Sequence, residues 1–370
     1  MVPINRRKFL GQASAALGAT LLLKACASPS DPSPSADSSA DSPAADSAAA
    51  PSSSSELFTI RFTLDWAIQG VHAPLGVAIA KGYFADEGLD VQFERGQGSA
   101  DSITKVAAGA FDMGFGDINS LMEFNITNPD TSVKAIAIYY NQSPMCIMSL
   151  AETGITEPAM LEGKILGIPA GSATRRMLPL FAQTAGFDLN QVELPAIESR
   201  LQQTLLLTKE IDAIAPFTIS ALPNLNAEGY PPEKLNIFRY ADYGLDFYGN
   251  AVLARQDFLE AHPEQMSAFL RALTKGLQDT LADPDDAVAI MAQFDELYDL
   301  SLERERLQIA IDTLFLSPEV EANGFGAVEP ERFAKTIGQV VEAFELPTTP
   351  KPEDVFDDRF LPELGDRQLM

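Results

Sequence analysis

The chain has 370 residues, of which 46% are hydrophobic, and a formal net charge of -26. The length is enough for two lobes of ordinary domain size, and a charge this negative argues against nucleic acid and an anionic bilayer as binding partners. Because the whole chain contains two cysteines and two histidines, a metal site of the usual His/Cys kind is not expected.

Residues 1–25 have the pattern of a secretory signal that is cleaved. Arg6 and Arg7 lie in a basic start that resembles a twin-arginine export signal. The apolar run that follows is shorter than the roughly 20 residues that span a bilayer. It ends in Leu-Lys-Ala-Cys at 23–26, which resembles a lipobox, so we expect Cys26 to be lipidated and to become the new N-terminus. Lys24 departs from the lipobox pattern, and an ordinary cleaved signal is the alternative.

Residues 26–55 contain little besides Ser, Ala, Pro and Asp. Such a composition buries too little apolar surface to offset the entropy of ordering, so we expect a disordered tether behind the lipid. Cleavage before Cys26 would remove four basic residues and no acidic one, which takes the net charge from -26 to about -30. The predicted product is exported, periplasmic or otherwise extracytoplasmic, and contacts the membrane through its lipid only.

The body alternates β-rich runs with helical patterns in two series, and helical patterns dominate from residue 256 onward. The first series predicts strands at 57–64, 89–93, 111–115 and 132–139 and helices at 72–84 and 99–108, with Ser99 as a plausible N-cap. The second predicts strands at 164–168, 191–194, 211–215 and 235–239 and helices at 171–185 and 200–208. Further helices are predicted at 262–281, 285–294, 302–315 and 330–344.

The order of the first series predicts an α/β unit with a largely parallel sheet. Two such units, followed by helices that pack back on the first, predict two lobes between which the chain crosses twice. We expect lobe I at 56–143 and 246–348, lobe II at 144–245 and a C-terminal tail at 349–370. Cys146 lies in an apolar run, so a buried, inert thiol is expected, and no intrachain disulfide is possible if Cys26 carries lipid.

Several short motifs of the body resemble one known family. Leu64-Asp65-Trp66, His72-Ala73-Pro74 and the segment 80–91 are similar to the opening of periplasmic solute-binding proteins of ABC importers. The family branch is the one that handles nitrate, sulfonates, taurine and thiamine-pyrimidine precursors. The segments 106–114 and 161–169 resemble its next blocks, and the resemblance covers roughly Phe58 to Leu346. The placement of the Asp-Trp pair and of His72 is most similar to the thiamine-pyrimidine subgroup.

The resemblance implies the α/β type II periplasmic-binding fold, in which two α/β lobes are joined by a two-segment hinge and hold the ligand between them. In such a fold, strand ends and helix starts of both lobes face the cleft. Asp65 and Trp66 follow the first strand, and a planar ligand could stack on this single tryptophan. His72 begins the next helix, where its imidazole could hydrogen-bond a heteroatom. A core tryptophan and a capping or surface histidine are the alternatives.

The other candidate ligand contacts lie in loops of the same kind. Gly98 and Ser99 precede a helix, and Asp117 and Asn119 could pair with an amino-substituted ring or simply cap the next helix. One of Arg175 and Arg176 could meet an anionic group, although such arginines are more often solvated. The remaining candidates lie at the two crossings and in the corresponding loop of lobe II, and hinge packing is the alternative for the aromatic-rich segment 241–250. They are Asn141, Ser172, Tyr243, Asp246 and Tyr248.

These candidates form a pocket with aromatic walls, carboxylates and amides, and with few cations. Because anions are normally held by charge-assisted bonds, the pocket favours a neutral or cationic nitrogen heterocycle. We therefore expect a monomeric binding protein without catalytic activity or cofactor. It would deliver its small-molecule ligand to an ABC permease that a cytoplasmic ATPase drives. One alternative keeps this role with taurine, an alkanesulfonate or nitrate as ligand. A remote alternative is an enzyme similar to thiamine-pyrimidine synthases, whose cysteine-rich motif this sequence lacks.

Overall fold

The computed structural model describes residues 56–369, which belong to one compact unit. The predicted signal, the lipidation expected at Cys26 and the predicted tether lie outside the described residues. Within residues 56–369, no helix is long and apolar enough to cross a membrane.

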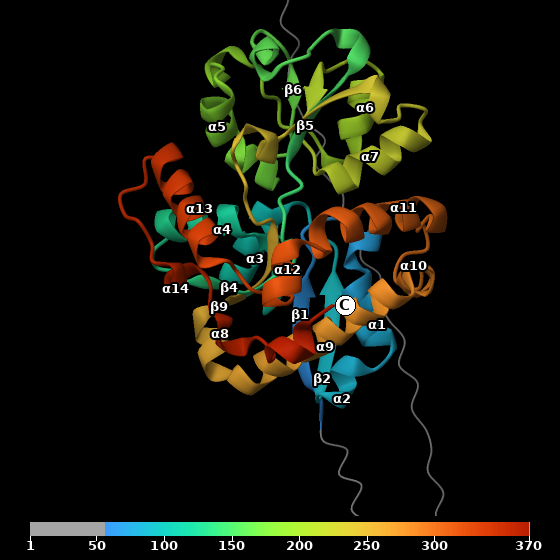
Figure 1. Cartoon of the computed structure of the whole chain (residues 1–370), viewed down its shortest axis with the longest axis vertical. Coiled ribbons are helices and arrows are strands. Elements are labelled where there is room, and N and C mark those ends of the chain that lie inside the picture. Colours follow the sequence, from blue (N-terminus) through green and yellow to red (C-terminus); the bar gives the residue numbers. More distant parts are fainter. Residues whose placement is uncertain (1–55, 370) are drawn as a thin grey trace, which may run out of the picture. The chain divides into compact units, whose positions relative to one another are not determined.

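The first sheet has five strands in the order β2-β1-β3-β9-β4 (Figure 1). β1 pairs in parallel with β2 and β3, whereas β9 runs antiparallel to β3 and β4. The sheet is therefore mixed, and the prediction of a largely parallel sheet is wrong. The difference arises because the chain re-enters this sheet after the second series and inserts β9 between two earlier strands. The strands are β1 (Phe58–Thr63), β2 (Leu89–Glu94), β3 (Met113–Asp117), β4 (Val133–Ile138) and β9 (Asn250–Arg255).

The second sheet has four strands in the order β6-β7-β5-β8. β5 is antiparallel to β7 and β8, whereas β6 and β7 are parallel. The segment predicted as a strand at 191–194 forms an isolated bridge between Glu193 and Ile165 instead of a strand. Cys146 begins β5 with its thiol buried, and this burial raises the pKa of the thiol. The strands are β5 (Cys146–Leu150), β6 (Leu166–Gly167), β7 (Ala213–Ile214) and β8 (Leu235–Arg239).

Helices surround both sheets, and Figure 1 shows α5, α6 and α7 gathered around the second one. The first series contains α1 (Ala73–Ala80), α2 (Tyr83–Asp86), α3 (Ser99–Ala107) and α4 (Ile118–Thr127). The second contains α5 (Ala173–Ala185), α6 (Gln202–Leu207) and α7 (Thr218–Ala227). The C-terminal part contains α8 (Gln256–Ala261), α9 (Pro263–Ala282), α10 (Pro284–Met291), α11 (Leu300–Ala310), α12 (Pro318–Asn323), α13 (Pro330–Ala343) and α14 (Pro352–Val355).

Three helix boundaries differ from the prediction for local reasons. The helix expected at 72–84 breaks at Gly82, whose φ of 79° belongs to the left-handed region that favours glycine. Ser99 is the first residue of α3 and makes no capping bond, because Gly98 occupies the N-cap position. The helix expected at 302–315 ends as α11 and continues as a π-helical turn, Ile311–Phe315.

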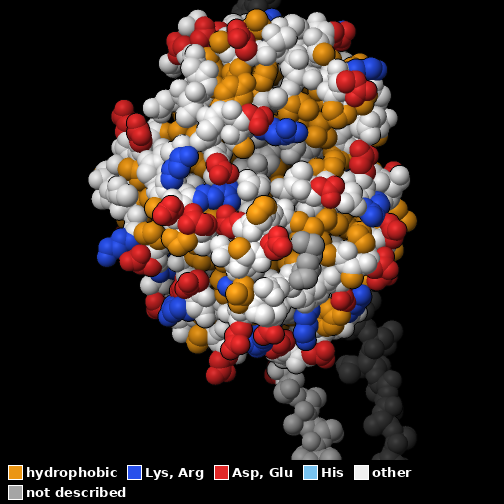
Figure 2. Space-filling view, in the orientation of Figure 1, with side chains coloured by type: hydrophobic (Ala, Val, Ile, Leu, Met, Phe, Trp, Pro, Cys, Tyr) orange, Lys and Arg blue, Asp and Glu red, His pale blue; other side chains and the backbone are white. Residues whose placement is uncertain are grey.

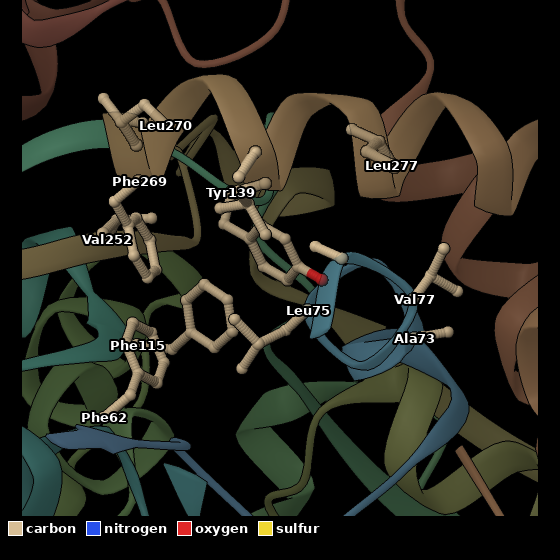
Figure 3. Packing of buried hydrophobic residues seen from close by; sticks show 14 of the residues in the cluster. Phe62, Ala73, Leu75, Val77, Phe115, Tyr139, Val252, Phe269, Leu270 and Leu277 are labelled. Atoms are coloured by element: carbon tan, nitrogen blue, oxygen red, sulfur yellow. The ribbon is translucent and has the colours of Figure 1, made fainter. Parts of the chain in front are cut away.

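The core of the first sheet lies between β1, β3, α1 and α9 (Figure 3). The ring of Phe62 packs 4.7 Å from that of Phe115 and 5.6 Å from that of Phe269, measured between centroids. Full burial of one such side chain contributes about 1.5–3 kcal/mol. α1 and α9 approach closely at Gly276, where a Cβ atom would lie 2.1 Å from the carbonyl oxygen of Pro74. This packing holds the β1–α1 loop in place.

The chain passes from the first sheet to the second between β4 and β5 and returns between β8 and β9. The expected lobe boundaries at 143/144 and 245/246 lie in these two crossing segments, and the lobe division stays a prediction. Residues expected as a C-terminal tail pack against β4. The Asp357 N–H donates to the Ala135 carbonyl oxygen at 2.8 Å, and the side chain of Phe360 is buried.

Candidate ligand-binding cleft

A cleft of about 290 Å³ lies among loops that follow strands of both sheets. This volume is close to the lower limit of the range, about 300–1,000 Å³, that small-molecule sites occupy. On the side of the first sheet, the cleft is lined by the loops that follow β1 and β2. On the side of the second sheet, it is lined by residues at or near the starts of α5, α6 and α7. The lining residues come from the segments 65–69, 95–99, 172–174, 199–203 and 215–224.

A buried Asp65–His72 pair lies at the β1 side of the cleft. Asp65 Oδ1 is 3.0 Å from His72 Nε2, and His72 Nδ1 accepts the backbone N–H of Gln69 at 3.2 Å. A ring nitrogen that accepts carries no proton, so the neutral imidazole has its proton on Nε2 and donates it to Asp65. His72 does not line the cleft, but it orients the carboxylate that does. Among the described residues, Asp65 Oδ2 has no hydrogen-bond donor, which leaves this oxygen for a ligand.

Two glycines allow the loops after β1 and β2 to touch. The Gly96 N–H donates to the Trp66 carbonyl oxygen at 2.8 Å, and the Gly98 N–H donates to that of Asp65 at 2.7 Å. A Cβ atom at Gly96 would lie 2.1 Å from the Leu64 carbonyl oxygen. Gly98 has a φ of 132°, and its Cβ would lie 2.1 Å from the carbonyl oxygen of Gly171 on the other side of the cleft. These contacts hold the backbone of Asp65 and Trp66 rigidly.

Aromatic and amide side chains provide the rest of the lining. Trp66 and Phe217 come from the loops after β1 and β7, and both rings are partly exposed. Gln69, Gln202 and Ser220 add polar groups, and the Ser220 hydroxyl donates to Gln69 Oε1 at 3.0 Å. Two partly exposed rings beside several hydrogen-bonding groups suit a planar polar ligand.

Two arginines also line the cleft and were not among the predicted contacts. Arg95 precedes the Gly96–Gly98 loop, and Arg200 precedes α6. The Arg200 side chain is 80% exposed and pairs with Glu198 at 3.0 Å. The cleft therefore has more cations than the sequence predicts, and no spacing in the sequence marks these two arginines. Figure 2 shows basic, acidic and apolar side chains intermixed on the face in view.

Five of the predicted ligand contacts line this cleft: Asp65, Trp66, Gly98, Ser99 and Ser172. Ser172 also caps α5 by accepting the N–H of Arg175 at 3.3 Å. Within residues 56–369, no group of three or more His, Cys, Asp or Glu side chains could hold a metal ion.

Three other predicted ligand contacts interact with residues away from the cleft. Asp117 caps α4 by accepting the N–H and the hydroxyl of Ser120 at 2.7 and 2.8 Å. Asn119 donates to Asp117 Oδ2 and to the Tyr248 carbonyl oxygen at 3.0 and 2.8 Å. Tyr243 packs edge-on against Phe181, with 5.2 Å between ring centroids. The capping alternative therefore describes Asp117 better than ligand contact does.

The candidates at the crossings surround Arg332 of α13 instead of the cleft. Its guanidinium donates to the carbonyl oxygens of Asn141 and Phe247 at 2.9 and 3.0 Å, and it pairs with Asp246 at 3.2 Å. It also lies 4.0 Å from the ring centroid of Tyr248. Arg332 thus connects the two crossing segments through its contacts with Asn141, Asp246 and Tyr248. Arg332 lies 191 residues from Asn141 and 85 residues from Phe247 along the chain, so no local pattern could reveal this arrangement.

Arg175 and Arg176 do not line the cleft either. Arg175 donates to the carbonyl oxygens of Ile168 and Leu194 at 3.2 and 3.3 Å. Arg176 pairs with Glu123 of α4 at 3.4 Å.

The family model described as NMT1/THI5 like matches residues 69–287, which begin at the cleft and end in α10. The chain belongs to this family. A relative named formylaminopyrimidine-binding protein, from Halalkalibacterium halodurans, is 27% identical over 77% of this chain and 86% of its own length. The riboflavin-binding protein RibY of Chloroflexus aurantiacus is 24% identical over 92% of this chain and 95% of its own.

More distant similarity extends to an enzyme and to solved binding proteins. A 4-amino-5-hydroxymethyl-2-methylpyrimidine phosphate synthase of Aspergillus parasiticus is 25% identical over 65% of this NMT1/THI5-like chain and 70% of its own. The alkanesulfonate-binding protein SsuA of Xanthomonas axonopodis, solved with bound MOPS, superposes with a TM-score of 0.61 at 13% identity. The match covers 80% of this chain and 96% of SsuA. This likeness shows the fold, and the predicted type II periplasmic-binding fold is confirmed.

Proposed function

We propose that this protein is the extracytoplasmic solute-binding component of an ABC importer. In this role it captures a small planar nitrogen heterocycle of the thiamine-pyrimidine-precursor class and delivers it to a permease. Membership of the NMT1/THI5-like family and the relative that is named for a formylaminopyrimidine support the ligand class. The observation that carries the proposal is the Asp65 carboxylate, buried, oriented by His72 and free at one oxygen, beside the partly exposed Trp66.

The chemistry of the cleft favours a hydrogen-bond donor at its inner end. A buried carboxylate accepts hydrogen bonds from amino or ring N–H groups, and such bonds to a charged acceptor are about twice as strong as neutral ones. An anion placed against the same carboxylate would be repelled in a region that water screens poorly. An aminopyrimidine offers both the N–H groups for Asp65 and a flat face for Trp66.

The second candidate ligand is an anion such as taurine, an alkanesulfonate or nitrate. Arg95 and Arg200 favour it, because both line the cleft and arginine binds oxyanions in a forked geometry. Both side chains are exposed, however, and Arg200 already pairs with Glu198. Water weakens such pairs, so these arginines hold an anion less firmly than buried ones would.

The importer role also includes export and anchoring. We propose that residues 1–25 are a twin-arginine signal of the lipoprotein type and that Cys26 carries the lipid, as their pattern in the sequence indicates. The protein would act as a monomer without cofactor, tethered outside the cytoplasm near its permease.

The remote alternative is an enzyme like the synthase that the chain resembles at lower coverage. A cysteine-dependent reaction would need a reactive thiol near the ligand. Cys146 is buried in β5, its pKa is raised by burial, and it does not line the cleft. A binding function without chemistry therefore agrees better with the cleft.

Trp66 tests the proposed ligand class. Titration of the protein with a formylaminopyrimidine should perturb the emission of this single tryptophan, whereas taurine and nitrate should not. Trp66→Ala should lose roughly 1 to 3 kcal/mol of binding free energy, or about 5- to 150-fold in affinity measured by calorimetry, because a stacking partner is lost. The melting temperature of the unliganded variant should stay close to that of the wild type.

Three outcomes would correct the proposal. If Trp66→Ala unfolds the protein, the indole is a structural residue. If a sulfonate binds tightly and heterocycles do not, the importer role stands with the anionic ligand. If riboflavin alone binds, the ligand is a flavin, and the cleft must widen to admit its three rings.

A further inference from the structure

A buried arginine connects α11 to α7 beside the cleft. Arg306 lies on α11, which packs against the Gly70–His72 turn, and its side chain is 1% exposed. Its Nη1 donates to the carbonyl oxygens of Ile219 and Ser220 in α7 at 2.5 and 2.9 Å, and its Nη2 donates to Asn224 Oδ1 at 2.9 Å. Three of its hydrogen bonds therefore reach across to the helix that follows β7.

The sequence of α7 creates the acceptor for this arginine. Pro223 lies inside α7 and has no N–H, so the carbonyl oxygen of Ile219 lacks the donor that an α-helix supplies four residues later. A buried carbonyl group without a donor is costly, and Arg306 supplies the missing hydrogen bond from outside the helix. Pro223 thus prepares a carbonyl site that is complete only when α7 and α11 are in contact.

The same arginine is tied to the ligand-binding loop. Arg306 Nε donates to Glu303 Oε2 at 2.8 Å, and the same oxygen accepts the backbone N–H of Gly70 at 2.6 Å. Gly70 follows Gln69, which lines the cleft and accepts the hydroxyl of Ser220 in α7. A continuous chain of bonds therefore runs from the loop after β1 through Glu303 and Arg306 to the first turns of α7.

We propose that Arg306 and the carbonyl group freed by Pro223 form a latch that sets the balance between open and closed forms of the cleft. The inference rests on the proposed binding function and names how that same site is regulated. Separation of α7 from α11 would break the three bonds to α7 and leave the Arg306–Glu303 pair to water. Ligand in the cleft and the latch then stabilise the same closed form, so weakening the latch costs ligand affinity by population shift.

The latch can be tested without any ligand. Full-length protein with Cys26→Ser would receive two labels at the exposed positions Glu233 of the second-sheet side and Glu264 of α9, each replaced by Cys. The distribution of label distances reports opening directly, and the buried thiol of Cys146 does not compete for label. The test variants are Arg306→Met, which removes the donor, and Pro223→Ala, which restores the helical N–H for Ile219.

Matched controls exist for both variants. Arg304→Met removes an arginine from the same helix, where it pairs with Asp285 and does not reach α7. Pro179→Ala restores an N–H inside α5, at a proline that lies on an exposed surface. Pro179→Ala should keep or raise the melting temperature, because alanine favours a helix interior. Pro223 is buried, so in Pro223→Ala the loss of packing offsets part of this gain, and its melting temperature checks that it is folded.

We expect Arg306→Met and Pro223→Ala to shift the distances toward longer values, and the two controls to match the wild type. With a formylaminopyrimidine or riboflavin as probe, the dissociation rate should rise about tenfold in Arg306→Met, as expected when hydrogen bonds to a charged group are lost. The rise should be smaller in Pro223→Ala, which leaves the bonds of Arg306 to Ser220 and Asn224 in place. Unchanged distances in Pro223→Ala and in folded Arg306→Met would overturn the latch. If Arg306→Met does not fold, Pro223→Ala alone decides. If no probe binds the wild-type protein, the proposed ligand class is wrong. The label distances, measured without ligand, still test the latch.

Discussion

At the residue scale, His72 influences the cleft through Asp65, without lining the cleft itself. Its Nε2–H holds Asp65 Oδ1 at 3.0 Å, while its Nδ1 accepts the N–H of Gln69. The imidazole fixes the orientation of the Asp65 carboxylate, which we propose binds the ligand. Outer hydrogen-bond partners orient the ligands of metal sites in the same way. We therefore expect His72 to affect ligand binding although it does not line the cleft.

We predict that His72→Phe weakens binding of a formylaminopyrimidine by about tenfold or more, since a hydrogen bond to a charged group contributes roughly 1.5–3 kcal/mol. His72→Gln keeps an amide donor for Asp65 and should lose less. Titrations that follow Trp66 emission measure both, and circular dichroism checks the fold. Equal affinities for His72→Phe and the wild type would mean that Asp65 needs no support from the imidazole.

At the element scale, the N-cap of α4 is a carboxyl group whose charged form is destabilised by burial. Asp117 is fully buried, and desolvation raises its pKa from 3.8 to about 6 despite its bonds to Ser120 and Asn119. An acid whose pKa is higher in the folded state binds its proton more tightly there. Asp117 therefore lowers stability progressively as pH rises from about 4 to about 6, and the penalty is complete at neutral pH.

We predict that Asp117→Asn gains stability relative to the wild type as pH rises, by about 2 kcal/mol between pH 4 and pH 7. An asparagine still caps a helix. Urea unfolding at four pH values measures the difference. Asp283→Asn is the control, because Asp283 caps α10 while exposed to water. A pH-independent difference for Asp117→Asn would show that the buried carboxyl does not titrate in this range.

At the scale of the whole molecule, charge and anchoring act in opposite directions. The net charge of -26 repels the body from anionic lipid headgroups, so electrostatics cannot hold it at a membrane. Association would then depend entirely on the lipid expected at Cys26, which lies outside the described residues. The expected anchor and the cleft would in this sense be independent parts of the protein.

We predict that Cys26→Ser releases the protein from membranes or leaves its precursor uncut, even at low ionic strength. Cell fractionation and mass spectrometry of the N-terminus provide the measurement. A matched Cys146→Ser variant should stay with the membrane, because its thiol is buried in β5. Mature wild-type protein that is soluble, unmodified and cut elsewhere would refute the lipoprotein assignment.

Helices and strands whose signal is local could be predicted from the amino-acid sequence. The alternation at 57–64 corresponds to β1 (Phe58–Thr63), and the helical spacing at 262–281 corresponds to α9 (Pro263–Ala282). Ordered motifs were enough to indicate the family, and the position of Trp66 after the first strand was enough to put it at the cleft. Period and motif order are properties of neighbouring residues, so they can be read without the fold.

Which side chains contact each other depends on the folded structure. The antiparallel insertion of β9 and the clustering of Asn141 and Tyr248 around Arg332 join residues far apart in the chain. The fold likewise brings Arg95 and Arg200 to the same cleft. His72 was predicted as a ligand contact, but its partner Asp65 occupies its Nε2. The choice of hydrogen-bond partner depends on strand register and helix packing, which bring distant groups to within 3 Å. No spacing within the sequence carries that information.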